Sequence, residues 1–118
     1  NDASLVMVKG ARLNLKYYSI DGRIYNSDIR NLKIDDKIDA IVSDLPYGRN
    51  SPLLGDIESL YEAAFTRFSE LLDRGRYCIV IVGNERLLSY VNDFSIVDLV
   101  KIKVHNSLTR SFVVLRKN

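Results

Sequence analysis

The run Arg76-Tyr77-Cys78-Ile79-Val80-Ile81-Val82 constrains the fold of this chain most. It is an almost unbroken apolar segment that ends at Gly83-Asn84, which predicts a central strand. A second segment, Ile38 to Ser43, becomes nearly all apolar toward its end and predicts another strand that is buried on both faces. This second strand must finish before Pro46, because proline has no amide hydrogen to donate to a β-ladder.

Helical periodicity occurs before and between these strands. A helix is predicted from Ser4 to Tyr18, with Asp2 or Ser4 as its cap. A second helix is predicted from Asp56 to Leu72, after a loop from Gly48 to Gly55, and a short helix is expected from Glu85 to Asn92. The expected apolar stripe of the first helix is Leu5, Val8, Ala11, Leu15 and Tyr18, and that of the second is Leu60, Ala64, Phe68, Leu71 and Leu72.

The last quarter of the chain has a different pattern. Val100, Ile102 and Val104 alternate with polar residues, as in a strand with one face in water. A further strand from Ser111 to Leu115 follows a short turn, which predicts an antiparallel hairpin. With a short strand from Arg23 to Asn26, the order of elements predicts an α/β fold with a mostly parallel sheet and an antiparallel C-terminal edge.

Composition places few limits on function. The 118 residues are 47% hydrophobic and 27% charged, with a net charge of +2, which is ordinary for a globular domain. No apolar run approaches the length of a membrane span and no leader is apparent, so we expect a cytoplasmic protein with no membrane partner. The single cysteine, Cys78, lies in an apolar run and is expected in the core. With one histidine, no zinc cluster is expected.

The segment Asp44-Leu45-Pro46-Tyr47 contains the residues best suited to catalysis. It stands at the carboxyl end of a predicted strand, where open parallel sheets bind their ligands. An amine conjugated to a ring is a poor nucleophile, because its lone pair is delocalised. Acceptors on its N–H groups localise that lone pair. Asp44 can supply a carboxylate, the backbone at Leu45 or Pro46 can supply a carbonyl, and Tyr47 can stack on an unstacked base.

The stretch from Asp39 to Arg49 resembles the [D/N]-P-P-[Y/F] motif of S-adenosylmethionine-dependent amino-methyltransferases. It is most similar to the tRNA guanine-N2 methyltransferases that modify position 10, with Leu45 in place of the first proline. The segment from His105 to Arg110 resembles the family's C-terminal His-x-Ser-Leu-Thr-Arg and is a family marker to which we assign no chemistry. The early part of the chain also matches the family, at Asp2, Met7, Gly10, Ala11 and Asn14.

The resemblance implies a Rossmann-like methyltransferase fold, S-adenosylmethionine as cofactor and tRNA as substrate. It implies catalytic roles for Asp44, Pro46 and Tyr47. The implied cofactor-binding residues are Asp2, at the ribose, Asp28, near the adenine amine, and Ile29 and Asp44. The implied substrate-binding residues are Leu45, Tyr47, Gly48 and Arg49.

Each assignment has a simpler rival. The motif could be a turn that ends a strand, Asp28 could cap a turn, and Asp2 could cap a helix. Arg49 could be a solvated loop charge rather than a phosphate contact, and His105 fits a surface strand position.

The resemblance begins after the point where the family has its first strand and glycine-rich loop. We therefore expect a partial catalytic domain whose sheet has a gap, and favour a fragment of a longer enzyme. Two alternatives are a second chain or copy that fills the gap, as in a homodimer, and direct pairing of the Arg23–Asn26 strand with the Ile38–Ser43 strand. A DNA adenine-N6 or cytosine-N4 methyltransferase, and a non-catalytic α/β subunit, are the rival functions.

Overall fold

The computed structural model describes residues 1–47 and 56–118. The chain forms two compact units, Asn1–Ile34 and Asp35–Asn118, which are considered separately. No helix among the described residues has the length and apolar character needed to cross a membrane.

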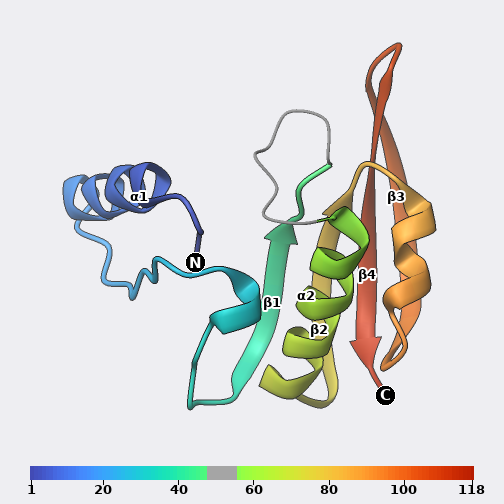
Figure 1. The fold of residues 1–118 in the computed structure, drawn as a ribbon, viewed down its shortest axis with the longest axis horizontal. Helices are drawn as coiled ribbons and strands as arrows, with labels where there is room; N and C mark the ends of the chain where they lie inside the picture. Colours follow the sequence, from blue (N-terminus) through green and yellow to red (C-terminus); the bar gives the residue numbers. More distant parts are fainter. Residues whose placement is uncertain (48–55) are drawn as a thin grey trace. The chain divides into compact units, whose positions relative to one another are not determined.

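The second unit is built on a four-stranded mixed sheet (Figure 1). Its strands are β1 (Ile38–Asp44), β2 (Leu72–Val82), β3 (Phe94–His105) and β4 (Leu108–Lys117), in the order β1-β2-β4-β3. β1 pairs with β2 in parallel, whereas β4 is antiparallel to both of its neighbours. The predicted antiparallel C-terminal hairpin is confirmed. The expectation of a mostly parallel sheet is wrong for these four strands, because β4 lies between β2 and β3 and runs against both.

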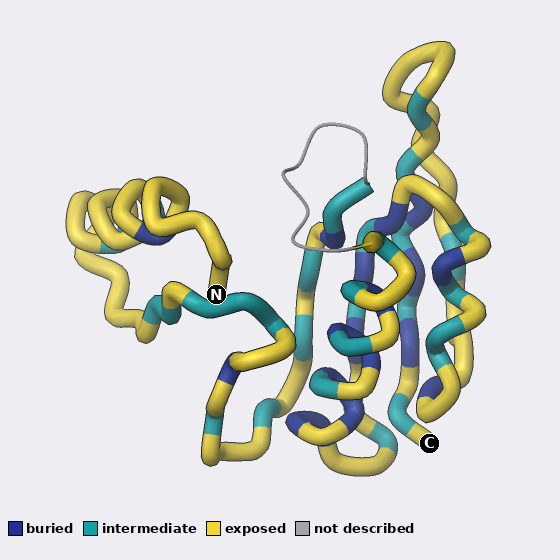
Figure 2. Tube along the Cα trace, in the orientation of Figure 1, coloured by how far each residue is buried: buried dark blue, intermediate teal, exposed yellow. Residues whose placement is uncertain are grey.

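Helix α2 (Ile57–Leu71) connects β1 to β2 and covers one face of this sheet. It begins at Asp56, whose carboxylate accepts a hydrogen bond from the Ser59 amide at 2.7 Å. Its apolar side chains meet the alternate residues of β2 and β4 that point toward it, and Figure 2 shows the buried positions gathered there. These core residues are Tyr61, Ala64, Phe65, Phe68, Leu71, Cys78, Val80, Val82, Val113 and Leu115. The predicted helix and its stripe are therefore largely confirmed, although Leu60 is only half-buried.

Strand β1 is the edge strand of the described sheet, and the prediction that it is buried on both faces is wrong. Val42 is 73% exposed. Its register partner is Ile79, so it points to the face opposite the buried Cys78 and Val80. That face of the sheet is not covered by α2. Val100, Ile102 and Val104 of β3 are about half exposed, because α2 does not cover them either. The prediction that they form the buried face of this strand is therefore wrong.

Two other elements of this unit differ from expectation. β2 begins at Leu72, directly after α2, and passes through Gly75, which has a φ of +83°. The segment predicted as a short helix from Glu85 to Asn92 is a 3₁₀ helix, η2 (Glu85–Tyr90), whose first turn is capped by the side chain of Asn84.

The first unit contains α1 (Leu5–Tyr17) and the short 3₁₀ helix η1 (Ile29–Asn31). Ser4, one of the two residues predicted to cap this helix, is the N-cap of α1. Val8 of the predicted stripe is buried, whereas Leu5 and Tyr18 are exposed. The predicted strand from Arg23 to Asn26 does not form in full. A single parallel bridge joins Asp2 to Asn26, because the chain turns into the α1 cap at Ser4 and offers no longer extended partner.

Gly75 provides a test of the β2 path. Its positive φ is costly for an L-residue, while a Cβ atom would meet only Arg116 at an ordinary 3.6 Å. We expect Gly75→Ala to lower the free energy of unfolding by roughly 1–2 kcal/mol in chemical denaturation. Gly75→Asn is the matched control and should cost clearly less, since asparagine tolerates this region. Equal losses for both variants would show that side-chain crowding, and not φ, is the cause.

Candidate active site at the carboxyl end of β1

The predicted motif lies at the end of β1, next to the central strand β2. The Leu45 amide donates a hydrogen bond to the carbonyl of Ile81 at 3.1 Å, which continues the parallel pairing one residue beyond the strand. The Leu45 side chain is 7% exposed and anchors this segment in the core. The backbone that carries Asp44 and Pro46 is therefore fixed by the sheet. The simpler interpretation as a strand-ending turn describes its geometry but not the contacts of its side chains.

The carboxylate of Asp44 and the hydroxyl of Tyr47 are in direct contact. The Tyr47 hydroxyl donates to Asp44 Oδ1 at 2.5 Å. Burial, followed by the hydrogen bond and the negative charge of Asp44, raises the pKa of Tyr47 to about 12, and the nearby Arg110 opposes this rise. Tyr47 is consequently a neutral donor at physiological pH. A carboxylate offers about four lone-pair sites, so Asp44 keeps acceptor capacity for a further N–H.

The carbonyl of Pro46 is held by a second tyrosine. The hydroxyl of Tyr61, a fully buried residue of α2, donates to the Pro46 carbonyl oxygen at 3.2 Å. Burial raises the pKa of Tyr61, so this hydroxyl also stays protonated. A carbonyl oxygen has two lone pairs, and one remains for a substrate. Asp44 and Pro46 thus present two oriented acceptors at one edge of the sheet.

Gly83 also belongs to this site, although its sequence context did not indicate a functional role. A Cβ atom on Gly83 would lie 3.0 Å from both Cγ and Cδ1 of Tyr47, closer than side chains normally approach. Only glycine lets the Tyr47 ring lie against the backbone just after β2. The available signal was a glycine directly after the clearest strand, which we interpreted only as the end of that strand.

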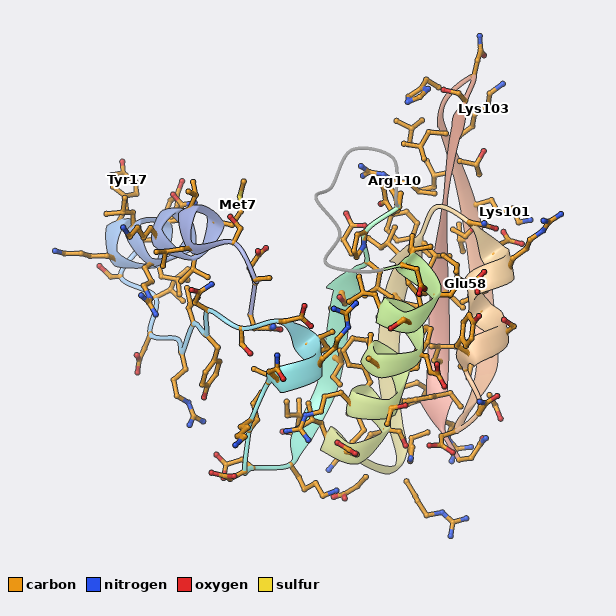
Figure 3. The ribbon with its side chains drawn as sticks, in the orientation of Figure 1. Met7, Tyr17, Glu58, Lys101, Lys103 and Arg110 are labelled. Atoms are coloured by element: carbon orange, nitrogen blue, oxygen red, sulfur yellow. The ribbon has the colours of Figure 1, made fainter. Side chains whose placement is uncertain are left out.

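Arg110 is a second residue that the sequence analysis left without a role. It lies in β4, and its guanidinium carbon is 5.5 Å from the centroid of the Tyr47 ring. Figure 3 shows it toward the end of the sheet at which β1 ends. A cation over an aromatic face is attracted by the ring quadrupole, so Arg110 helps to hold Tyr47 in place. The only indication of this role in the sequence was the resemblance of the segment from His105 to Arg110 to the pattern His-x-Ser-Leu-Thr-Arg.

The predicted cofactor residues Asp2, Asp28 and Ile29 belong to the first unit. Asp2 Oδ1 accepts from the Ser4 amide at 2.7 Å, and the parallel bridge places Asp2 opposite Asn26. Asp28 caps η1 through the Arg30 amide at 2.9 Å and forms an ion pair with the Arg30 guanidinium at 3.3 Å. The capping role considered for Asp28 is therefore present, whereas the cap of α1 is Ser4 and Asp2 binds the amide of that cap residue. Their cofactor roles stay predictions.

Two of the remaining candidates cannot be placed, and the structure gives the surroundings of His105 and Cys78. Gly48 and Arg49 are outside the described residues. His105 is an exposed residue whose Nδ1 accepts from the Ser107 amide at 3.3 Å. Cys78 is fully buried, and burial raises the pKa of its thiol to about 12, as expected of a core residue. A surface hollow of about 470 Å³ lies at the other end of the sheet and includes none of the predicted site residues. Its lining is Arg74, Gly75, Ser95, Arg116, Lys117 and Asn118.

Solved structures show the class of fold. A S-adenosylmethionine-dependent methyltransferase from Clostridium acetobutylicum aligns with a TM-score of 0.76 at 14% identity, over 98% of this chain and 73% of that one. The N-methyltransferase NodS from Bradyrhizobium japonicum, solved with S-adenosyl-L-homocysteine, aligns with a TM-score of 0.77 at 14% identity, over 98% and 64%. TrmN from Thermus thermophilus aligns with a TM-score of 0.72 at 20% identity, over 97% and 33%. The chain therefore has a Rossmann-like methyltransferase fold.

Sequence comparison shows the family. Residues 1–111 match the RMKL-like methyltransferase domain family (UPF0020), and the chain belongs to it. A tRNA (guanine(10)-N2)-dimethyltransferase from Methanothermobacter thermautotrophicus is 37% identical over 94% of this chain. A protein of the same name from Pyrococcus abyssi is 28% identical over 92% of the chain. The chain spans about a third of the length of these relatives, 34% and 35%.

The contact between Gly83 and Tyr47 makes a specific prediction. Gly83→Ala should displace the Tyr47 ring, because the added methyl group would lie 3.0 Å from its Cγ and Cδ1 atoms. We expect the free energy of unfolding to fall by roughly 1–3 kcal/mol in chemical denaturation, the scale of overpacking a filled site. The control is Gly10→Ala, where an added Cβ has no atom within 4 Å. An unchanged free energy of unfolding for Gly83→Ala would contradict the close contact between Gly83 and the Tyr47 ring.

Proposed function

We propose that this domain transfers a methyl group from S-adenosylmethionine to the exocyclic N2 amine of guanine in tRNA. The observation that carries the proposal is the pair of oriented acceptors, the carboxylate of Asp44 and the carbonyl of Pro46, beside the aromatic ring of Tyr47. The names of the two curated relatives support guanine in tRNA as the substrate. A tRNA substrate is consistent with a cytoplasmic enzyme.

Asp44 and Pro46 act on the amine before it is methylated. The guanine amine has two N–H groups, and one can donate to each of these acceptors. Donation draws the nitrogen toward a tetrahedral shape and localises its lone pair, which makes it a better nucleophile. The acceptors are preorganised, because the sheet holds Leu45 and the two tyrosine hydroxyls hold Asp44 and Pro46. After transfer, one proton leaves the nitrogen, and Asp44 is the adjacent base.

Tyr47 has two roles in this scheme. Its ring is the stacking surface for a base that has left its own stack, and Gly83 and Arg110 fix the position of that ring. Its hydroxyl shares Asp44 with the incoming amine. The phenol is neutral at physiological pH and does not place a second negative charge beside Asp44, and the rise of its pKa to about 12 extends this neutral range into alkaline solution.

The first unit fits the cofactor by the chemistry of its donors. Asp2 is exposed, and a carboxylate there suits the two hydroxyls of a ribose. Asp28 and the backbone of Ile29 suit the adenine amine and ring. When bound, S-adenosylmethionine supplies an electrophilic methyl group on its sulfonium.

A DNA adenine-N6 or cytosine-N4 methyltransferase is the competing enzyme, because those amines need the same two acceptors. The relatives' names favour tRNA over DNA. Methylation of a tRNA transcript and of duplex DNA by the full-length protein, measured with labelled cofactor, separates the two. If the folded protein methylates neither the tRNA nor the DNA, the result would favour a non-catalytic subunit.

Asp44→Asn tests the catalytic assignment. The change keeps the size of the side chain but replaces a charged acceptor with a weaker neutral one. We expect the rate of methyl transfer at saturating tRNA to fall by at least about 100-fold, the scale of losing one preorganised polar group. Asp39→Asn, an exposed carboxylate at the other end of β1, is the matched control and should retain activity. Near-wild-type turnover of Asp44→Asn would remove Asp44 from the mechanism.

Asp2→Ala tests the cofactor assignment. Hydrogen bonds to a charged group contribute about 1.5–3 kcal/mol, so the Kd for S-adenosylhomocysteine should rise roughly 10- to 100-fold in calorimetric titration. Asp21→Ala changes an exposed aspartate of the same unit and should leave the Kd unchanged. If Asp2→Ala binds S-adenosylhomocysteine as tightly as the wild type, Asp2 has no role in cofactor binding and serves only as the acceptor for the Ser4 amide.

A further inference from the structure

The charge of the chain is unevenly distributed along its sequence. Residues 99–118 contain five lysines and arginines and no acidic residue, so they carry +5, while the preceding 98 residues carry −3. Arg116 and Lys117 lie at the end of β4 away from the candidate site, where Lys117 pairs with Asp93. The other cations, Lys101, Lys103 and Arg110, belong to the end of the β3–β4 hairpin, which we define as residues 101–111.

The register of the sheet relates this hairpin end to the candidate site. Asp44 pairs with Ile81, Ile81 with Phe112, and Phe112 with Val100, so these four residues form one row across the sheet. Beyond this row β3 continues for five residues, to His105, before the chain turns back into β4. At about 3.3 Å per residue, the hairpin end projects roughly 16 Å past the row that contains Asp44. Figure 1 shows this projection on the side of the sheet where β1 ends.

The three cations of the hairpin end have different surroundings. Lys101 forms an ion pair with Glu85 at 2.9 Å, and Arg110 lies over the Tyr47 ring. Lys103 is exposed, and within the described parts of the chain no carboxylate forms an ion pair with it. Figure 3 shows Lys103 farther along the hairpin than Lys101. Lys103 is therefore the cation of this projection that is available to a ligand.

We propose that the hairpin end is an RNA-backbone contact, in which Lys103 binds a phosphate close to the nucleotide whose base enters the Asp44 site. This inference rests on the proposed function. With strands about 4.8 Å apart, β3 lies roughly 14 Å from β1, and Lys103 lies roughly 10 Å beyond the row of Asp44. That is within the reach of nucleotides that flank an unstacked base. The absence of acidic residues after Asp98 suits a polyanion, and the shared edge with a base-binding site favours RNA over an anionic membrane.

The test is the salt dependence of RNA binding. A lysine that neutralises one phosphate contributes to the slope of log Kd against log salt by about 0.7–0.9. We expect Lys103→Gln in the full-length protein to reduce this slope by that amount for a tRNA transcript, and to raise Kd at low salt. Lys103→Glu should weaken binding further. The affinity for S-adenosylhomocysteine and the rate of methyl transfer at saturating tRNA should be unchanged.

The matched control is Lys37→Gln, which removes an exposed lysine of the same unit at the opposite end of the sheet. It should leave the slope unchanged. A wild-type slope and Kd for Lys103→Gln would overturn the inference even if the protein methylates tRNA. So would Lys103-dependent binding to phosphatidylserine vesicles without any effect on RNA. Conversely, a Lys103-dependent slope without tRNA methylation would support the hairpin contact and refute the proposed function.

Discussion

The parallel pairing of β1 with β2 is the interaction on which the rest of the site depends. It places Asp44 opposite Ile81 and extends through the bond from the Leu45 amide to the Ile81 carbonyl. Because β2 lies between β1 and β4 and carries the buried residues Cys78, Val80 and Val82, this pairing fixes a polar motif to a strand of the core. The acceptors at Asp44 and Pro46 then need little rearrangement when a substrate arrives, which is the condition for effective electrostatic catalysis.

Two tyrosines complete this arrangement, one fully buried and one half-buried. Tyr61 lies inside the interface of α2 with the sheet, so its hydroxyl has a buried partner in the Pro46 carbonyl. Tyr47 lies against Gly83 and under Arg110, and its raised pKa keeps it a neutral donor to Asp44. The same apolar packing that stabilises α2 on the sheet therefore also orients the polar groups of the motif.

Much of the fold could be predicted, because its elements follow local patterns. The apolar spacing in α2, the run of β2 and the alternation in β3 each identify an element within a few neighbouring residues. The failures have a common cause. The exposure of Val42 depends on which strands and helices surround β1, and the reduction of the Arg23–Asn26 strand to one bridge depends on the partner that Asp2 offers. Neither outcome can be predicted from the residues of the segment alone.

The sequence by itself determined that a carboxylate, a proline carbonyl and an aromatic ring follow a strand, since Asp44, Pro46 and Tyr47 are neighbours in the chain. Only the tertiary structure decided what holds them. Tyr61, Gly83 and Arg110 come from a helix, a strand end and a hairpin that are distant in sequence, and they converge because the sheet order places β4 next to β2. Local periodicity reports which face of an element is apolar. It carries no information about which distant side chain that face will meet.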